Sequence, residues 1–589
     1  MATRSPSPGF GADAGMFALG GAVAIGALLW AAGATSSLMA GHPVPRGHPL
    51  AGMAAFAHFR DPSLAWGGPV GPAGVYWSAV AVVALVVMGT VVTFWLVARR
   101  LGRRVDEDPT RIEGLASRRQ IEAAAGAKPL VARASILRPS LRHPKVGQVG
   151  YYLGSSRGAA CWASVEDSIF VLGPPRSGKG LHAVIPSILD SPGAVITTAT
   201  RADNLSVTMT ARSGNGPVGV FDPQGLAAGV PSALRWSPVR GCERPQTAFV
   251  RAAALCADAG KEVDSGSFWR QQTLTALRCL LHAAALGERP PADLYRWSLA
   301  PAAAREAVDI LVHAPRSALA WDRALDSIIS ADQRQRDSVW AMVSNALACL
   351  ADPRVLDSVS PEPGEEFQPS KFLKDNGTLY LLGTASGAAS TAGLVAALVE
   401  DVVEVARRLA TASPGGRLDP PLGLILDEAA NYPLPSLPAL MSEGGGTGIT
   451  TIAVLQSLDQ ARHRWGRDAA GAIWDSAIAK VILPGVSNAD DLAGIARLVG
   501  ERKEREISET SQPGGAKSVS SSTRDRAILN PAMIRSIGPG HGLLLLRSAK
   551  PIMLTLKPWT ARSDAKTLSA GREAIESTIQ QAAAGGLEQ

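Results

Sequence analysis

Cysteine is scarce in this sequence, and it forms no paired pattern. Five cysteines occur in 589 residues, and none belongs to a Cys-x-x-Cys pair. Paired cysteines at short spacing mark structural zinc sites, and disulfide frameworks need a denser set. The pattern therefore argues against both kinds of site, and we expect reduced, mostly buried thiols in a cytosolic domain. The five residues are Cys161, Cys242, Cys256, Cys279 and Cys349.

Charged residues are also few, at 19% of the chain, whereas apolar residues reach 46%. This balance favours attachment to a membrane. The formal net charge of +7 favours anionic neighbours, either nucleic acid or phospholipid, and the basic flanks of membrane helices supply part of it. We find no internal repeat, and the length allows about three or four domains of ~150 residues each.

Two long runs near the N-terminus carry no charge. Met16 to Met39 is almost entirely apolar or small, and Val75 to Ala98 is followed by Arg99, Arg100, Arg103 and Arg104. Each run is long enough to cross a hydrocarbon core of ~30 Å as a helix. By the positive-inside rule the remaining chain faces the cytoplasm. We predict two transmembrane helices in the inner (cytoplasmic) membrane. The alternatives are a cleaved signal peptide for the first run, or a buried helical hairpin.

Short apolar, β-rich runs alternate with helical patterns from Tyr151 onward. Buried parallel strands have this pattern, so we predict an α/β fold with a doubly wound sheet and a ligand beyond the carboxyl ends of its strands. A helical interval, about Thr247 to Asp352, interrupts the alternation and predicts an inserted all-α domain, with its tryptophans in the core. The β-rich runs are residues 168–172, 194–198, 218–221, 378–382, 422–426, 450–455 and 479–483.

The C-terminal part continues with three further segments. The polar stretch Glu501 to Arg526, with Pro513-Gly514-Gly515 inside it, predicts a mobile loop. Two apolar runs, Gly542–Leu546 and Pro551–Leu556, predict a late hairpin that completes the sheet. From residue 561 the chain has a helical pattern that frays at its end.

A glycine-rich turn follows the first β-rich run and precedes a helical segment. Its spacing, Gly-x-x-x-x-Gly-Lys, is that of a phosphate-binding P-loop, in which backbone N–H groups and a helix N-terminus face the phosphates. Lys179 is expected to reach the β- and γ-phosphates, and Gly180 stands where Ser or Thr usually binds Mg²⁺. The alternative is an ordinary turn with a surface lysine. The predicted nucleotide-binding residues are Gly173, Pro174, Pro175, Arg176, Ser177, Gly178, Lys179, Gly180 and Leu181.

Two later strand ends carry candidate catalytic side chains. The run 422–426 ends in Asp427 and Glu428, the Walker B pattern, in which the first acid holds Mg²⁺ directly or through water and the second polarises the attacking water. Gln456 ends the next predicted strand, where it would sense the γ-phosphate or orient water. The predicted catalytic set is therefore Lys179, Asp427, Glu428 and Gln456. The alternative is a strand end capped by two solvated acids.

Together with the two spans, these motifs resemble the type IV secretion coupling proteins of the TraG/TraD kind. The resemblance extends from about Gly150 to Leu556. The shared pieces are Gly178-Lys179-Gly180, Val184-Ile185-Pro186, Pro192-Gly193, Val220-Phe221-Asp222-Pro223, Ser267-Phe268-Trp269, Asp427-Glu428-Ala429-Ala430-Asn431, Leu455-Gln456-Ser457-Leu458-Asp459-Gln460-Ala461 and Arg464-Trp465-Gly466.

The resemblance implies a RecA/FtsK-like P-loop motor that hydrolyses ATP with Mg²⁺ and works as a hexamer at the inner membrane. Its substrate would be single-stranded DNA with a relaxase, recruited through relaxosome proteins and delivered to a type IV secretion channel in conjugation. A related motor for protein effectors or for duplex DNA, and a nucleotide-gated scaffold without turnover, stay open as alternatives. The parts predicted from the sequence pattern are a membrane anchor (1–104), a basic connector (105–150), a nucleotide-binding motor domain (151–244 and 358–560), an inserted all-α domain (245–357) and a C-terminal tail (561–589).

Two positions depart from the family pattern. The glycine-rich loop after Walker B, Glu443 to Gly448, has no arginine to act on a neighbouring subunit's nucleotide, which leaves Arg462 and Arg464 as candidates. The segment Thr200-Arg201-Ala202-Asp203 replaces the family's usual Asp-x-Lys-Gly-Glu-like run, so the role of Arg201 or Asp203 near the nucleotide is open.

Overall fold

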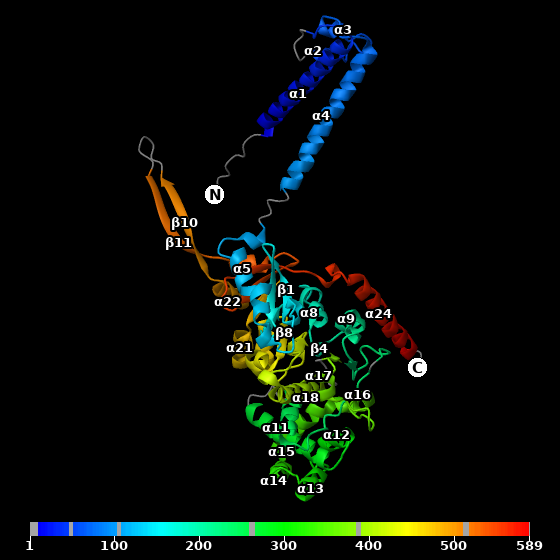
Figure 1. Cartoon of the computed structure of the whole chain (residues 1–589), viewed down its shortest axis with the longest axis vertical. Coiled ribbons are helices and arrows are strands. Elements are labelled where there is room, and N and C mark those ends of the chain that lie inside the picture. Colours follow the sequence, from blue (N-terminus) through cyan, green and yellow to red (C-terminus); the bar gives the residue numbers. More distant parts are fainter. Residues whose placement is uncertain are drawn as a thin grey trace, which may run out of the picture. The chain divides into compact units, whose positions relative to one another are not determined.

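The chain forms two compact units, Met1–Asp108 and Pro109–Gln589, which are described separately (Figure 1). This computed structural model describes residues 10–45, 51–102, 108–231, 233–257, 266–384, 390–510 and 518–587. Further structural statements concern these residues.

The first unit is helical over its described residues. Two long helices, α1 (Phe10–Met39) and α4 (Ala73–Gly102), pack on each other, and the short α2 (Ala51–Ala54) and α3 (Ser63–Trp66) connect them. One described segment, Ala73–Trp95, is long and apolar enough to cross a membrane, whereas the apolar stretch Ile25–Met39 is shorter. The structure thus contains one candidate span, and a second crossing stays a prediction. The side chains of the four flanking arginines lie outside the described residues.

The second unit is built on an eleven-stranded sheet. Its strand order is β2-β1-β13-β12-β9-β3-β8-β7-β4-β6-β5. The strands are β1 (Gly150–Ser156), β2 (Ala159–Ser164), β3 (Ile169–Leu172), β4 (Val195–Ala199), β5 (Val218–Phe221), β6 (Thr378–Leu382), β7 (Leu422–Leu426), β8 (Ile449–Leu455), β9 (Ala479–Ile482), β12 (His541–Leu546) and β13 (Ile552–Thr555).

Within the run β9-β3-β8-β7-β4-β6-β5 of this order, each pair of adjacent strands is parallel. Every residue of β3, β4, β6, β7 and β8 is buried, as expected for strands that helices cover on both faces. All seven β-rich runs of the sequence coincide with parallel strands, and the predicted late hairpin is β12–β13. The predicted α/β architecture is confirmed in this part of the sheet.

The remaining strands make the sheet mixed, and they add β1 and β2, which the sequence analysis did not predict, to the doubly wound part and the late hairpin. β12 pairs antiparallel with β9, and β13, β1 and β2 extend the sheet outward, also antiparallel. Short turns join β1 to β2 and β12 to β13, and such turns connect antiparallel strands only. β1 and β2 escape the sequence analysis because each mixes buried with partly or fully exposed residues, so they form no continuous apolar run.

Helices fill the interval between β5 and β6. Trp297 and Trp340 are buried in its core and Trp269 and Trp321 are partly buried, so the prediction that these side chains pack in the core is confirmed. The helices are α10 (Pro245–Leu255), α11 (Gly266–Leu286), α12 (Pro291–Leu299), α13 (Arg305–His313), α14 (Trp321–Ile329), α15 (Gln333–Leu347), α16 (Pro353–Ser358) and α17 (Pro369–Lys374).

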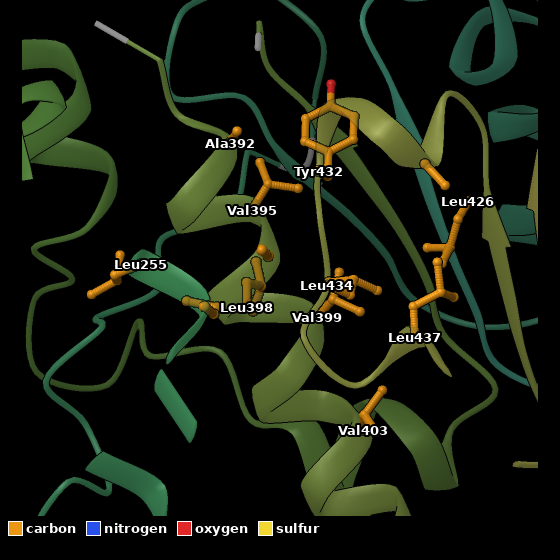
Figure 2. Packing of buried hydrophobic residues seen from close by; sticks show 14 of the residues in the cluster. Leu255, Ala392, Val395, Leu398, Val399, Val403, Leu426, Tyr432, Leu434 and Leu437 are labelled. Atoms are coloured by element: carbon orange, nitrogen blue, oxygen red, sulfur yellow. The ribbon is translucent and has the colours of Figure 1, made fainter. Parts of the chain in front are cut away.

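The core of this helical interval continues into the core under the sheet through α18. Buried side chains of α18 share one apolar cluster with Leu255 of α10 and with Leu434 and Leu437, which follow the two acids at the end of β7 (Figure 2). The other helices around the sheet are α8 (Ile185–Asp190), α9 (Asp203–Ser213), α18 (Ala392–Thr411), α19 (Leu437–Glu443), α20 (Leu458–Trp465), α21 (Arg467–Ser476), α22 (Ala489–Val499) and α23 (Pro531–Arg535).

The segment expected as a basic connector contains three helices, α5 (Arg118–Ala125), α6 (Ala127–Ala132) and α7 (Ala134–Leu137). Their apolar side chains, including Ile121 and Leu130, are buried against the antiparallel part of the sheet. The second unit accordingly begins at Pro109 rather than near Gly150. The domain boundaries of the sequence analysis otherwise stay predictions.

The segment expected as a mobile loop forms a two-stranded antiparallel ribbon, so that prediction is wrong for its strands. β10 (Glu501–Thr510) pairs with β11 (Ser518–Ala527) residue by residue along its whole length. Cross-strand ion pairs such as Arg526–Glu504, 2.8 Å, support this pairing. The sequence does not predict this ribbon, because polar side chains on both of its faces give no alternation of apolar and polar residues. Pro513-Gly514-Gly515 lies outside the described residues.

The C-terminal segment folds as a long helix, α24 (Ala565–Leu587), which packs along α9 (Figure 1). Leu568 is buried in this contact, and Ile575 and Ile579 are partly buried beside it. Gly571 lies so close to α9 that a Cβ atom there would be 3.1 Å from Thr210 Oγ1.

Helix α9 is fixed to the sheet by a buried arginine. Arg212 donates hydrogen bonds to the carbonyl oxygens of Ser191 (2.9 Å) and Gly193 (2.8 Å), just before β4, and to Thr378 Oγ1 (2.8 Å) at the start of β6. Its side chain therefore links α9 to two neighbouring parallel strands.

We expect Arg212→Ala to lower the free energy of unfolding by about 3 kcal/mol, because buried oxygen acceptors lose their donors and a cavity remains. Chemical denaturation of the purified chain measures this. The matched control is Arg118→Ala, which removes only an exposed ion pair with Glu122 and should cost less than about 1 kcal/mol. Equal effects of the two substitutions would contradict the prediction.

Candidate functional site

The predicted P-loop is a tight turn between a buried strand and a helix. β3 ends at Leu172, residues 173–179 form the turn, and a wide π-type helical turn, η3 (Gly180–Val184), leads into α8. Arg176 and Gly178 adopt the left-handed backbone conformation, with φ of 63° and 85°. A Cβ atom on Gly178 would lie 2.8 Å from His182 Cδ2. The turn therefore requires glycine at position 178.

Strand order brings the predicted catalytic residues together. β3, which leads to Lys179, pairs with β8, which leads to Gln456, and β8 pairs with β7, which leads to Asp427 and Glu428. Because these neighbouring strands are parallel, their carboxyl ends meet at one edge of the sheet. The N–H of Gly173 also donates to the carbonyl of Leu455 (2.9 Å), which fixes the start of the turn against β8.

At this edge the Lys179 ammonium lies between the two acids. Its Nζ atom is 3.0 Å from Glu428 Oε1 and 3.5 Å from Asp427 Oδ1. Gln456 Nε2 donates to the same Glu428 Oε1 at 3.1 Å. All four residues of the predicted catalytic set therefore lie in one cluster, although they come from three strands.

Three further polar residues hold the acids, and sequence reasoning did not assign them to the site. Thr200 Oγ1 and Asn431 Nδ2 donate to Glu428 Oε2 at 2.9 and 3.0 Å. Asn204 Nδ2 donates to Asp427 Oδ2 at 3.3 Å. Asn431 follows Glu428 by only three residues, so the sequence could have indicated that it lies near the acids. Thr200 and Asn204 become neighbours of the acids only because β4 pairs with β7.

The two acids have different electrostatic environments. Burial raises the pKa of Asp427, because loss of solvation outweighs the attraction of the Lys179 ammonium. Loss of solvation also acts to raise the pKa of Glu428, but the hydrogen bonds and the charge of Lys179 together bring it below its ordinary value. The ionised form is therefore favoured more at Glu428 than at Asp427, which is the more deeply buried of the two acids.

A cavity of about 640 Å³ opens beside this cluster. Its polar wall includes Lys179, the two acids and Gln456, and its apolar wall includes Ile185 and Trp559. Five predicted nucleotide-binding residues line it, and the others, Gly173, Pro174, Ser177 and Gly178, shape the turn behind them. The five that line the cavity are Pro175, Arg176, Lys179, Gly180 and Leu181.

The first turn of α9 and the C-terminal helix complete the cavity. Arg201 and Asp203, whose role the sequence left open, both line it. Arg572 and Glu576 of α24 line it as well, although the sequence analysis assigned nothing to this segment. Arg462, a candidate for action on a neighbouring subunit, is paired with Asp459 and Asp491 in its own chain and does not line the cavity.

The donor set fits a Mg²⁺ ion that a phosphate ligand helps to hold. Asp427 Oδ1 is buried, and its partner among the described residues is the Lys179 ammonium at 3.5 Å, a distance too long for a good hydrogen bond. The space around Gly180 is open, since a Cβ atom there would meet nothing within 4 Å. No group of three or more His, Cys, Asp or Glu residues in the described chain forms a metal site by itself. Mg²⁺ typically uses one or two carboxylates, with phosphate and water oxygens as the other ligands.

Comparison with known proteins gives a family match over part of the chain. Residues 421–539 match the family model described as the TraM recognition site of TraD and TraG. This segment starts just before β7 and ends before β12, so it contains the two acids and Gln456. A search of curated protein sequences finds no match.

Solved structures of one conjugative coupling protein share the fold. The unbound monoclinic form of the bacterial conjugative coupling protein TrwBdeltaN70 matches with a TM-score of 0.52 and 16% identity, over 74% of this chain and 92% of that one. Its trigonal form in complex with sulphate gives 0.51 and 17%, over 67% and 86%. The plasmid coupling protein TrwB in complex with ADP and Mg²⁺ gives 0.50 and 17%, over 72% and 91%. At these identities the likeness establishes the fold alone.

The geometry of the P-loop predicts different effects at two of its three glycines. We expect Gly178→Ala to lower the free energy of unfolding by about 1–2 kcal/mol, because alanine disfavours φ near 85° and its Cβ meets His182. Gly180→Ala should leave stability unchanged or raise it by up to about 1 kcal/mol, since this helical position has free space. Chemical denaturation of both variants measures the contrast, and a Gly180→Ala variant as unstable as Gly178→Ala would contradict it.

Proposed function

We propose that this chain, whose family-model match and fold support membership of the type IV coupling proteins, is a membrane-anchored ATP hydrolase of conjugation. The observation that carries the proposal is the cluster of Lys179, Asp427, Glu428 and Gln456 at one edge of the sheet, beside a cavity of about 640 Å³. A P-loop lysine against two acids and a polarising amide is an arrangement suited to phosphoryl transfer to water.

In this proposal each residue has a defined task. The backbone N–H groups of the turn 173–180 and the N-terminus of the following helix bind the phosphate chain, and Lys179 leaves the acids to contact its terminal phosphates. Glu428, ionised and held by Thr200 and Asn431, orients and polarises the attacking water. Gln456 positions that water or the γ-phosphate. A bound Mg²⁺, held through Asp427, would neutralise charge on the phosphate oxygens.

The proposal also covers membrane attachment, oligomeric state and cargo. Helix α4 anchors the chain in the inner membrane, with α1 as a second crossing, and the large unit lies in the cytoplasm. Six copies form the active ring, and the helical interval between β5 and β6 recruits single-stranded DNA with its relaxase for a type IV secretion channel. The description of the matched family model, a TraM recognition site, supports a relaxosome protein as partner.

We expect Glu428→Gln to retain binding of Mg²⁺–ATP and to reduce ATP turnover at least about 100-fold. The amide keeps the shape of the side chain and can accept hydrogen bonds at one of its two terminal atoms, but it does not polarise water as the carboxylate does. Phosphate release by the full chain in detergent, with and without single-stranded DNA, measures this. The control is Glu122→Gln, the same chemical change at an exposed residue of α5, which packs on the edge strand β2.

If the Glu428→Gln variant hydrolyses ATP as fast as the wild-type chain does, this role for Glu428 is contradicted. If the wild-type chain binds ATP but shows no turnover even with single-stranded DNA, the molecule is a nucleotide-gated scaffold. The observation that favours the scaffold function is Gly180, which lacks the hydroxyl group that usually binds Mg²⁺ at this position.

We expect Lys179→Ala to abolish conjugative transfer in cells, because the P-loop loses the charge that holds the terminal phosphates. The measurement is the transfer frequency of a mobilisable plasmid from a donor strain that carries only the variant. Lys128→Ala, an exposed lysine on α6, serves as the matched control and should transfer normally. Undiminished transfer by Lys179→Ala would reject the motor function. Normal DNA transfer with loss of protein export would instead point to an effector cargo.

A further inference from the structure

We infer that the C-terminal helix supplies a nucleotide-binding residue to its own chain: Arg572 of α24 binds the phosphate part of the nucleotide that the P-loop holds. This inference rests on the proposed function, because it assumes a nucleoside triphosphate in the cavity beside Lys179. It assigns a role to a segment that lies far from the motifs in sequence.

Helix α24 presents Arg572 from the face that packs on the body of the unit. Leu568, Ile575 and Ile579 are the apolar contacts of this face, and Gly571 lies against Thr210 of α9. Arg572 follows Leu568 by four residues and precedes Ile575 by three, so it lies on the same side of the helix. The packing of α24 on α9 therefore sets the position of Arg572.

Arg572 lines the same cavity as Lys179, Asp427 and Glu428. Its side chain is 48% exposed, so a ligand in the cavity has access to its guanidinium group. Its Nε donates to Glu576 Oε1 at 2.7 Å, and Asp203 also stabilises its charge. Both acids line the cavity too.

Arg572 has both the apolar wall of the cavity and its acids nearby. The apolar wall, suited to a heterocyclic base, is formed by Leu181, Ile185, Val207 and Trp559, and Leu568, one turn before Arg572, packs with the last three. Asp203, which also stabilises the charge of Arg572, precedes Asn204, whose Nδ2 lies 3.3 Å from Asp427 Oδ2. Because a guanidinium group binds phosphate oxygens through charge-assisted hydrogen bonds, we assign Arg572 to the phosphates rather than to the base.

Arg572 is one of four cationic residues that line the cavity. The others are Arg176, Arg201, whose Nε is 3.9 Å from Asp203 Oδ2, and Lys179, which is shared between two carboxylates. A triphosphate in this cavity needs further positive charge close to it. Guanidinium groups bind phosphate oxygens in a two-pronged geometry, and a phosphate can displace Glu576 because it offers more charge to the same donors.

The competing interpretation is an ordinary helix pair four residues apart, which contributes little to stability and nothing to ligand binding. The two interpretations differ in one measurable quantity. If Arg572 only pairs with Glu576, its removal leaves nucleotide affinity unchanged. If Arg572 binds phosphate, its removal weakens binding without unfolding the chain.

The test is isothermal titration of the full chain in detergent with Mg²⁺–ATP and, separately, with inorganic triphosphate. We expect Arg572→Ala to raise the Kd for both ligands about tenfold, the loss typical of one charge-assisted contact. Arg572→Lys should restore part of the affinity. Lys566→Ala is the matched control, since it removes a positive charge from the same helix but not from this cavity. Thermal unfolding of each variant checks that α24 remains folded.

A double-mutant cycle with Glu576→Gln tests how the arginine is held. We expect this substitution to tighten ATP binding more when Arg572 is present than in the Arg572→Ala background, because only then does it release a guanidinium group. Equal effects in both backgrounds would show that Glu576 acts as a bulk charge, and would overturn the proposed displacement.

The outcomes separate this inference from the proposed function. If the wild-type chain binds neither ligand, or binds ATP equally well after Lys179→Ala, the proposed function fails and the inference fails with it. If wild-type binding depends on Lys179 but Arg572→Ala binds like Lys566→Ala, the inference alone is wrong. If Arg572→Ala weakens binding of ATP but not of inorganic triphosphate, the assignment to the phosphates is overturned.

Discussion

The contact between the Lys179 ammonium and the carboxylates of Asp427 and Glu428 is the interaction on which the rest of the site depends. It joins a turn after β3 to the end of β7, with β8 between them. A lysine and two acids at this depth require one another, since each would otherwise carry an uncompensated charge next to a buried sheet. The same mutual neutralisation leaves the cluster ready for a ligand, because a phosphate chain and a cation can take over both sets of charges.

The fold keeps this cluster in place through contacts that carry no charge. Tyr432 donates its hydroxyl to the carbonyl oxygens of Ala199 (2.8 Å) and Gly383 (2.5 Å), and so joins the ends of β4 and β6 beside the acids. Leu434 and Leu437, a few residues further, pack into the cluster formed by α18 (Figure 2). The same cluster includes Leu255 of the helical interval, so the segment proposed to bind cargo and the acids share one continuous core.

The predictable part of the fold and site consists of features that repeat locally in the sequence. Fully buried parallel strands are continuous apolar runs, and the P-loop has a spacing that only a strand–turn–helix context satisfies, so both were found. The antiparallel strands β1 and β2 and the ribbon β10–β11 were missed, because a half-exposed or fully polar strand has no apolar run to mark it. For the same reason the segment before β1 was expected to be a connector, although Ile121 and Leu130 pack against the sheet.

By itself the sequence determined the chemistry that is available: a P-loop lysine, a pair of acids and a glutamine, each at the end of a β-rich run. Only the tertiary structure decided which other groups join them. Thr200 and Glu428 are 228 residues apart yet hydrogen-bonded, and Arg572 lies in the same cavity as Lys179. The physical reason is that motif spacing records contacts within one turn or strand, whereas these neighbours depend on strand order and on how one helix packs against another. Neither strand order nor helix packing produces a periodic pattern in the sequence.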